Sequence, residues 1–591
     1  MPDWSYHVIF QPILTKLSPS TSREFIHRGM NTIASLPLGP HIINFLGREE
    51  SSPYLKRSLN GIELKNPVGL SGKIDPLQSG TKAFSNLGFG FLEIGPLTIA
   101  PTKTEKQPIV DRKKQQIIFP DSSPSIGLLA TIEKLKKLRK KQPLLLRLSG
   151  RPSEINEMIL QLEPYADGYI IESFETNFIS SPTKPLFIGI SLDHLAKTDF
   201  ELLNSCAGIV INSGAGTFQD LLKNVENWRK RGFQQSIITS GGIVEPENAL
   251  QLLNAGVDAV MLSDGYVFSG PGLTKRVNEA LVSSVLVESS PQKGWFSYWI
   301  FGLFIFLGGL LALLFSLTSI ILPYDEAFLN MKKEVIWQFN DRIMLFMAHD
   351  RMTLAGTMIS GGIVYMTLAY YGIRQKLRWA KQATDVAAII GFLGIFSFIG
   401  FGYFDWLHLL FWLILLPFFL YGFFQTRGIC GTPSSSNRKN DSSWYRSLFG
   451  QFLLVLLGFS FVVGGVVIST FGVTSVFVPT DLLYICMTPE QLQQFNQDLI
   501  PVMAHDRAGF GSALLSVGLL VLMLALWGFQ QGNKWVWWTF FVGGLPAFIS
   551  GIYIHYAIGY TSFVHLLPAY FAIGLYVGGL LLSFSFFHKL R

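Results

Sequence analysis

One five-residue sequence occurs twice in the C-terminal half and carries side chains that could do chemistry. Met-Ala-His-Asp-Arg is found at Met347–Arg351 and again at Met503–Arg507. The two copies lie inside the longer matches Gln338–Gly356 and Gln494–Ser512. Each copy joins a histidine, which can carry a proton or bind a metal, to a carboxylate and a permanent cation.

Ionisable residues at the edge of a membrane are costly and need an explanation. The residues in question are His349, Asp350, Arg351, His505, Asp506 and Arg507. One interpretation is structural, with Asp–Arg pairs that cap helix starts and hold the two repeats together. A second is a site for quinone, haem or protons, with the histidines as ligands or proton carriers, and a third is a transported ligand. One histidine per repeat, without an i, i+4 partner, selects no metal, so we predict no metal site and do not expect haem.

Two glycine-containing loops in the N-terminal half could hold phosphate. Ser240-Gly241-Gly242 and Ser263-Asp264-Gly265 each follow a short apolar run. Glycine lets backbone N–H groups approach phosphate oxygens closely, so these loops predict a ligand that carries phosphate. The alternative, that the glycines only end strands, stays open.

These loops fall in a pattern of short apolar runs that alternate with helical stretches. Eight alternating strands in this length predict an α/β TIM barrel, (β/α)8, whose site lies at the strand C-termini. The loops after strands seven and eight are then the two glycine loops. The strands are expected in Asn66–Gly72, Phe89–Gly95, Pro143–Ser149, Asp167–Ser173, Pro185–Ser191, Gly208–Gly214, Gln235–Gly242 and Ala259–Gly265.

The remainder of the chain has the composition of a membrane protein. Only 15% of all residues are charged and 49% are hydrophobic, which excludes a disordered or purely soluble protein. Nearly all of the low-charge sequence follows residue 294, where runs of about 20 apolar residues are long enough to span a bilayer. We predict about eight transmembrane helices in two four-helix repeats, at Trp295–Ile321, Met352–Gly372, Val386–Tyr403, Leu407–Phe424, Ser447–Val478, Ala508–Phe529, Trp535–Ile554 and Phe563–Phe587.

The basic residues predict the orientation of this half. The loops at 373–385, 425–446 and 530–534 and the tail at 588–591 hold eleven Lys and Arg residues, against three in the opposite loops. We therefore expect a multi-pass protein of the cell membrane, with the barrel and both termini in the cytoplasm. The net charge of +7 reflects these basic loops, so no nucleic-acid partner is expected. Three scattered cysteines indicate no disulfide framework, and the oligomeric state is not predicted.

Residues 20–285 resemble dihydroorotate dehydrogenase, the FMN enzyme of pyrimidine synthesis, and are most similar to its membrane-associated, quinone-reducing class. The matching segments are Arg23–Gly47, Asn60–Asp75, Gly88–Thr102, Ile238–Ile243 and Leu262–Leu273. The resemblance implies an N-terminal helical extension at 1–60 and a barrel at 61–290. Membrane repeats at 295–424 and 447–591, joined by a cytoplasmic linker at 425–446, complete the predicted domains. The FMN contacts it implies are Ser71, Gly72, Gly95, Asn212, Gly241, Gly242, Ser263, Asp264 and Gly265.

The chain departs from this family at the substrate site. The substrate lysine is replaced by Pro76, and the asparagine-rich orotate loop corresponds to Pro120–Leu129, which has lost its asparagines. Arg147 replaces the family's asparagine at the end of strand three, and Gly189 replaces its flavin-contacting lysine after strand five. The loop that carries the catalytic serine has none at that position, and Glu175 is the nearest proton acceptor.

Two functions are consistent with this sequence. The first is a membrane-bound FMN oxidoreductase that resembles dihydroorotate dehydrogenase, with Glu175 as base and electrons passed to quinone. The second is a catalytically degenerate barrel that binds a phosphorylated ligand and regulates a polytopic transporter or sensor. The retained phosphate loops favour the enzyme, and the lost base and asparagines favour the binder.

Overall fold

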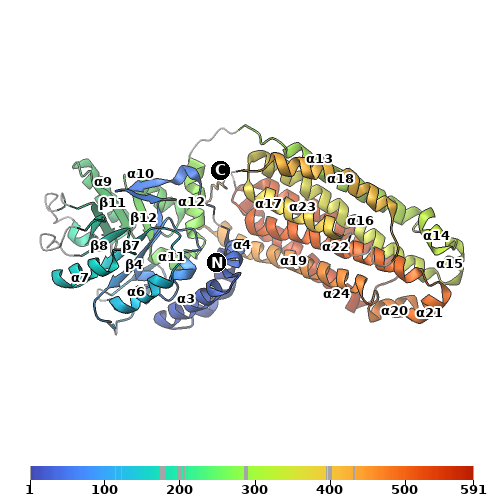
Figure 1. Cartoon of the computed structure of the whole chain (residues 1–591), viewed down its shortest axis with the longest axis horizontal. Coiled ribbons are helices and arrows are strands. Elements are labelled where there is room, and N and C mark those ends of the chain that lie inside the picture. The colour runs from blue at the N-terminus through green and yellow to red at the C-terminus, as the bar shows by residue number, and fades with distance from the viewer. Residues whose placement is uncertain are drawn as a thin grey trace. The chain divides into compact units, whose positions relative to one another are not determined.

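A computed structural model describes residues 2–48, 50–104, 106–113, 115–120, 123–172, 182–195, 203, 206–284, 290–394, 396, 402–429, 431 and 433–589. The chain forms two compact units (Figure 1). The first contains Met1–Val287 and Thr432–Trp444, and the second contains Glu288–Gly431 and Tyr445–Arg591. The finer division into an extension, a barrel, two membrane repeats and a linker stays a prediction.

The first unit contains a closed barrel of eight parallel strands, as the sequence predicts. Each strand pairs with the next one along the chain, and the last pairs with the first. Seven of the eight predicted segments contain one of these strands, and the segment Phe89–Gly95 overlaps β4, which continues to Leu97. They are β3 (Val68–Leu70), β4 (Phe91–Leu97), β7 (Leu144–Leu148), β8 (Gly168–Ile171), β9 (Leu186–Ser191), β10 (Gly208–Asn212), β11 (Ser236–Ser240) and β12 (Ala259–Leu262).

Helices cover the outside of the barrel because each presents one apolar stripe to the strands. In α9, for example, Leu221, Val225 and Trp228 follow one another at helical spacing and are buried. The helices are α5 (Thr81–Phe84), α6 (Leu128–Lys137), α7 (Pro152–Leu162), α8 (Leu192–Leu195), α9 (Phe218–Lys230), α10 (Pro246–Asn254), α11 (Asp264–Ser269) and α12 (Leu273–Ser284).

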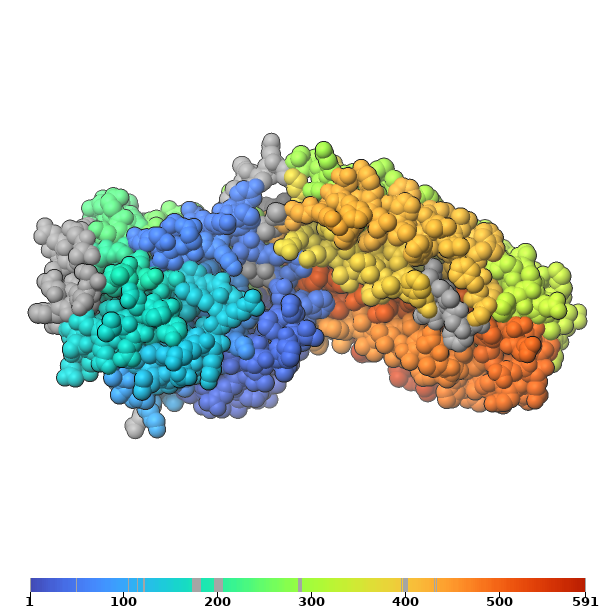
Figure 2. Space-filling model, viewed as in Figure 1, coloured from blue at the N-terminus to red at the C-terminus, as the bar shows by residue number. Residues whose placement is uncertain are grey.

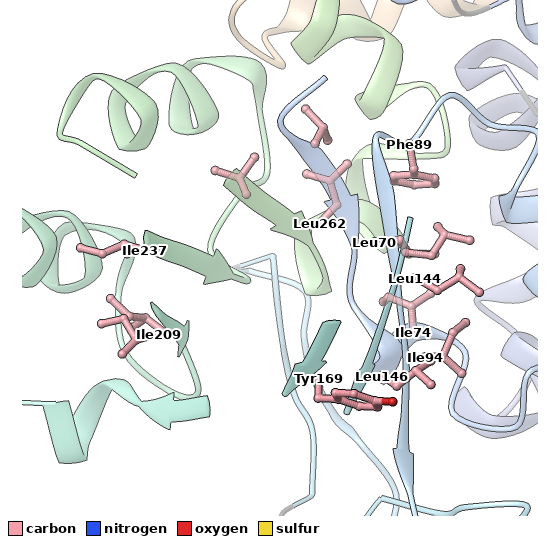
Figure 3. Close-up of a cluster of buried hydrophobic side chains, with 14 of the residues drawn as sticks. Leu70, Ile74, Phe89, Ile94, Leu144, Leu146, Tyr169, Ile209, Ile237 and Leu262 are labelled. Carbon is pink, nitrogen blue, oxygen red and sulfur yellow. The ribbon is translucent and has the colours of Figure 1, made fainter. Parts of the chain in front are cut away.

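The barrel has two hydrophobic cores, one on each face of its sheet. The outer core lies between strands and helices, and Figure 3 shows part of it, with Leu70 and Leu262 on the neighbouring strands β3 and β12. The inner core fills the barrel with residues such as Phe91, Phe187 and Met261. A hairpin of β1 (Arg57–Leu59) and β2 (Ile62–Leu64) contributes Leu59, Ile62 and Leu64 to the inner core and so closes one end.

Short helices precede the barrel and lie on the outside of this unit, in dark blue in Figure 2. They are α1 (Asp3–Ser5), α2 (Gln11–Leu14), α3 (Pro19–Ser35) and α4 (Gly39–Gly47). The last two helices and the turn between them expose several large apolar side chains, namely Phe25, Ile33, Leu36, Leu38 and Ile42. Exposed apolar side chains, where they form a patch, mark a membrane or partner contact.

Part of the predicted linker at 425–446 also belongs to the barrel unit, which includes Thr432–Trp444. The Asn440 amide donates to Val244 O at 2.9 Å and accepts from the Arg276 guanidinium at 2.6 Å. Trp444 lies 4.2 Å from the same guanidinium. Sequence reasoning indicated only a linker here and did not predict these contacts.

Seven described helices of the second unit are long and apolar enough to cross a membrane, and they indicate a membrane-associated protein. They are α13 (Trp295–Thr318), α16 (Asp341–Thr367, continued to Gln375), α18 (Trp406–Gln425), α19 (Ser442–Val473), α22 (Leu499–Trp527), α23 (Lys534–Ala557) and α24 (Phe563–His588). The predicted span at Val386–Tyr403 coincides in part with α17 (Arg378–Gly394), and part of it lies outside the described residues.

The internal repeat of the sequence is present in the structure as two sets of matching elements. The short helices α14 (Pro323–Leu329) and α15 (Lys333–Phe339) match α20 (Pro479–Ile485) and α21 (Pro489–Phe495). The repeats exchange equivalent contacts, since Asn340 Nδ2 donates to Ile485 O and Asn496 Nδ2 donates to Leu329 O, both at 2.9 Å. Helix α16 packs along α23 and α17 along α22, so each repeat packs through its second helix against the third helix of the other.

Candidate functional site

The predicted phosphate loops lie where the barrel fold requires them, after β11 and β12. Gly241 and Gly242 adopt φ angles of +92° and +74°, which L side chains rarely accept. A Cβ on Gly265 would lie 1.8 Å from Ile243 O, so the two loops are in close contact. The backbone N–H groups of Gly242, Gly265 and Ile117 all lie near the Asp264 carboxylate, and we call this place the anion cradle.

The anion cradle is filled by a carboxylate of the protein itself. Asp264 Oδ1 accepts a hydrogen bond from Gly242 N at 3.2 Å, and the backbone N–H groups of Gly265, Asp264 and Ile117 lie close enough to favour its charged form. Asp264 is only 5% exposed, and burial raises its pKa although the backbone donors oppose that shift. Asp264 therefore occupies a donor of the loops that the sequence predicts to hold phosphate.

A hairpin that the sequence did not predict contributes to this arrangement. It consists of β5 (Ile109–Asp111) and β6 (Gln116–Ile118). Gln116 Nε2 donates to Gly214 O at 3.2 Å and to Gly216 O at 3.3 Å, on the loop after β10. The hairpin therefore lies over the end of the barrel where the loops after β10, β11 and β12 meet.

A second polar group occupies the interior of the barrel at the same end. Arg147 forms a buried ion pair with Glu93, and its Nη1 donates to Glu172 Oε1 at 2.9 Å. Ser71 Oγ and Gly72 N donate to Glu93 Oε2 at 3.1 and 2.9 Å. Burial opposes the charge of Arg147, but Glu93 and Glu172 raise the pKa of its guanidinium. Ser71 and Gly72, both predicted to contact FMN, thus donate to a carboxylate of the chain.

The remaining predicted contacts lie close to this group. Gly95 O is 2.5 Å from the position of a Cβ on Gly72, so these two glycines pack together. Arg147 Nη1 is 2.6 Å from the position of a Cβ on Gly189, the residue that the family resemblance aligns with a flavin-contacting lysine. The arginine therefore takes up the space beside β9. Asn212 ends β10 and is 8% exposed, and Ser263 is buried beside Asp264.

Three buried polar atoms at the ends of the strands have no hydrogen-bond partner among the described residues. They are Arg147 Nη2, Asn212 Oδ1 and Thr239 Oγ1. Buried polar atoms without partners are costly and often contact a ligand or water. The predicted base, Glu175, lies outside the described residues.

In the membrane half, the His-Asp-Arg triplets lie within α16 and α22 and not at their first turns, so they do not cap the helices. Their arginines instead connect the repeats. Arg351 Nε donates to Asp506 at 2.7 Å, and Arg507 Nε donates to Asp350 at 3.1 Å.

Each arginine also binds an aspartate in its own repeat, with Arg351 bound to Asp325 and Arg507 to Asp481. Both of these aspartates are fully buried and accept from a tyrosine hydroxyl, that of Tyr403 or Tyr560. All four carboxylates are therefore paired.

The two triplet histidines belong to two related groups of side chains. His349 lies close to His555 and His565, and His505 lies close to Asp405 and His408. In each group, the triplet histidine comes from one repeat and its partners come from the other. We call His349, His555 and His565 the histidine cluster. Sequence reasoning noted neither His555 nor Asp405, although His408 and His565 occupy similar places in the two repeats.

A cavity of about 420 Å³ lies beside the second group. Its walls are largely apolar and include Phe301, Phe411 and Trp412, whereas Asp405, His408, His505, Arg351 and Asp506 contribute polar groups. An apolar cavity with a few polar groups is typical of a small-molecule site.

A closed TIM barrel and a set of long apolar helices define a membrane-associated protein with a barrel domain. No protein-family model matches the chain. It is similar to the dihydroorotate dehydrogenase (quinone) of Kineococcus radiotolerans, with 20% identity over 47% of this chain and 95% of the relative. It is also similar to the dihydroorotate dehydrogenase (quinone) of Sphingopyxis alaskensis, with 24% identity over 39% of this chain and 82% of the relative. A DHODH structure from Eimeria tenella, in complex with ferulenol, matches at 19% identity and a TM-score of 0.37, over 45% of this chain and 91% of that one. These relatives show that the barrel segment has a distant similarity to dihydroorotate dehydrogenases.

Proposed function

We propose that this chain is a multi-pass membrane protein whose barrel is catalytically degenerate and acts as a ligand-responsive module for the membrane half. The observation that carries the proposal is the Asp264 carboxylate in the anion cradle. The phosphate of FMN would bring negative charge to the same backbone donors, and two like charges in a buried site repel strongly. The described residues therefore do not fit FMN, and the same holds for any ligand that needs phosphate in this cradle.

The ligand that this barrel takes is instead a small molecule without phosphate at that position. Arg147 Nη2 and Asn212 Oδ1 offer one donor and one acceptor that no described residue satisfies. A ligand with both an acceptor and a donor would satisfy the two atoms together. The basic loops support a cytoplasmic position for the barrel and both termini, with the lipid bilayer as the partner of the apolar helices.

The test replaces the carboxylate that fills the cradle. Full-length protein in detergent is titrated with FMN, and bound flavin is measured by quenching of its fluorescence. The wild type should not bind FMN, whereas Asp264→Ser should bind it at least about tenfold more tightly, because a factor of ten requires the removal of only about 1.4 kcal/mol of repulsion. Asp258→Ser is the matched control, since Asp258 precedes β12 and pairs with Arg229.

Two outcomes would contradict the proposal. One is stoichiometric flavin in the wild-type protein as purified. The other is an Asp264→Ser variant that binds FMN no better than Asp258→Ser, because the carboxylate would then not be what blocks the cradle.

The second candidate is a membrane-bound FMN oxidoreductase that converts dihydroorotate to orotate and passes electrons to quinone. It is favoured by the names of the relatives, by the exposed apolar side chains of α3 and α4, and by the apolar cavity with His408 and Asp405 among its polar groups. Glu175 would serve as the base. This candidate predicts a flavin absorption band that bleaches when dihydroorotate is added.

A further inference from the structure

Three helices bring the side chains of the histidine cluster together. His349 lies on α16, His555 near the end of α23, and His565 near the start of α24. The turn between α23 and α24 is short, so the last two histidines approach each other. His555 Nε2 lies 3.0 Å from His349 Nε2 and 3.0 Å from His565 Nε2. His349 and His555 are buried, and His565 is partly exposed.

The other ring nitrogens of two of these histidines have partners that fix their protonation. His349 Nδ1 lies 2.9 Å from Asp350 Oδ1, and the Asp350 carboxylate also accepts from Arg507. His555 Nδ1 lies 2.5 Å from Gly551 O. A carboxylate that is paired with arginine can only accept a hydrogen bond, and so can a backbone carbonyl. Nδ1 therefore carries the proton in both rings. When both rings are neutral, their Nε2 atoms therefore hold lone pairs that face each other.

Hydrogen bonds cannot satisfy this arrangement. An imidazole nitrogen has either one N–H or one lone pair, so His555 Nε2 can form one hydrogen bond in the plane of its ring. It nevertheless has two imidazole nitrogens at 3.0 Å. At least one of the two contacts is therefore repulsive unless a cation lies between the nitrogens.

We propose that His349, His555 and His565 bind one divalent transition-metal ion through their Nε2 atoms. Such an ion binds imidazole at about 2.0–2.1 Å, and at that length two nitrogens 3.0 Å apart subtend about 94° at the metal. A tetrahedral site needs a separation of about 3.3 Å, which a shift of a few tenths of an ångström supplies. Three protein ligands would leave the fourth position of a tetrahedral site to water or a small ligand, as in catalytic zinc sites.

Asp350 and Gly551 supply the outer contacts that such a site requires. Metal-binding histidines usually donate their second N–H to a carboxylate or a backbone carbonyl, which orients the ring and makes the ligating nitrogen more basic. His349 and His555 each have one such acceptor. Because Arg507 holds Asp350, the ion pairs between the repeats also position the metal ligand.

The related group of Asp405, His408 and His505 is less suited to a metal. One of its ligand atoms would come from Asp405, which already accepts from Tyr324 Oη at 3.0 Å and from Leu407 N at 2.7 Å. His408 Nδ1 also binds this carboxylate, at 2.6 Å. These contacts satisfy Asp405 without an ion, so the proposal is confined to the histidine cluster.

The test measures metal bound to the full-length protein in detergent. The protein is stripped with a chelator and dialysed against Co²⁺ or Zn²⁺, and bound metal is then counted by mass spectrometry. Cobalt adds an optical readout, because its absorption reports nitrogen coordination. The variants are His555→Ala and the milder His565→Gln. The matched control is His588→Ala, because His588 is partly exposed and ends the helix near whose start His565 lies.

Wild-type protein and His588→Ala should bind about one ion per chain and share one cobalt spectrum. His555→Ala and His565→Gln should each lose that ion and the spectrum. Three results would overturn the proposal: no saturable binding by the wild type, equal loss in His588→Ala, or loss in His408→Ala with retention in His555→Ala. The first would indicate that the histidines share protons instead. If His555→Ala does not fold, the cobalt spectrum of the wild type and the loss of metal from His565→Gln still test the proposal.

Discussion

The anion cradle of the barrel and the histidine cluster of the membrane half differ in how far their polar groups satisfy one another. The cradle lies where the family resemblance predicts a phosphate site, but Asp264 already occupies its donors. The histidine cluster lies in the membrane half, outside the segments that carry this resemblance, and its His555 Nε2 has two imidazole nitrogens at 3.0 Å although it can form only one hydrogen bond. The comparison teaches that a motif locates a site, whereas the partners of its polar atoms decide whether a ligand is needed.

The largest expected effect comes from Arg507, which connects the two repeats. Arg507→Ala leaves the buried carboxylates of Asp350 and Asp481 without their cation, which should cost about 3–5 kcal/mol of stability. It should also reduce metal binding, because Asp350 orients His349. Thermal unfolding in detergent measures the first effect.

The matched control for Arg507 is Lys332→Ala, which removes an exposed ion pair with Glu326. That pair should contribute about 0–1 kcal/mol. Equal loss of stability in the two variants would contradict the structural role of Arg507.

The corresponding change in the barrel is Arg147→Met. Glu93 would stay buried but would keep its hydrogen bonds from Ser71 and Gly72, so the expected loss is about 3 kcal/mol. The double variant Arg147→Met/Glu93→Gln should recover most of that loss, because no uncompensated charge remains. Denaturant unfolding checks this, and a double variant as unstable as the single one would argue against the ion pair.

A smaller effect is expected at Gly189, beside Arg147. A Cβ there would lie 2.6 Å from Arg147 Nη1, so Gly189→Ala must displace the guanidinium, at a cost of about 1–3 kcal/mol. Gly29→Ala in α3 meets nothing within 4 Å and should stabilise the protein by about 0.5–1 kcal/mol. The unfolding midpoint should fall in Gly189→Ala and rise in Gly29→Ala, relative to the wild type. An unchanged midpoint in Gly189→Ala would show that Arg147 does not fill this space.

The smallest effect concerns the pH dependence of stability. Burial raises the pKa of Asp264 in the folded protein above the ordinary value of 3.8, so the folded state holds the proton more firmly than the unfolded state does. The stability that Asp264 contributes is therefore present at low pH and is lost as the pH rises from about 3.8 through the folded pKa. Asp264→Asn should remove this loss, so the difference in free energy of unfolding between the variant and the wild type should increase in favour of the variant across that pH range. A constant difference between the two proteins would contradict the raised pKa.

Sequence reasoning placed all eight barrel strands, because apolar runs bounded by glycine carry their signal locally. It did not predict the state of the site, since that depends on contacts between distant residues. The sequence predicted Asp264 only as part of a phosphate-binding loop. It did not predict the hairpin that brings Ile117 close to Asp264. The single charges Glu93 and Arg147 within apolar strands were the available signal for a buried ion pair. In the membrane half, the repeat was visible, but the meeting of His349 with His555 depends on how α16 packs along α23.

One preparation tests the central comparison most directly. Full-length protein purified without added metal or flavin is assayed for transition metal by mass spectrometry and for flavin by absorbance. We predict about one metal ion per chain, lost in His565→Gln, and no flavin band. Stoichiometric flavin in protein that neither contains nor takes up metal would contradict the account in both regions.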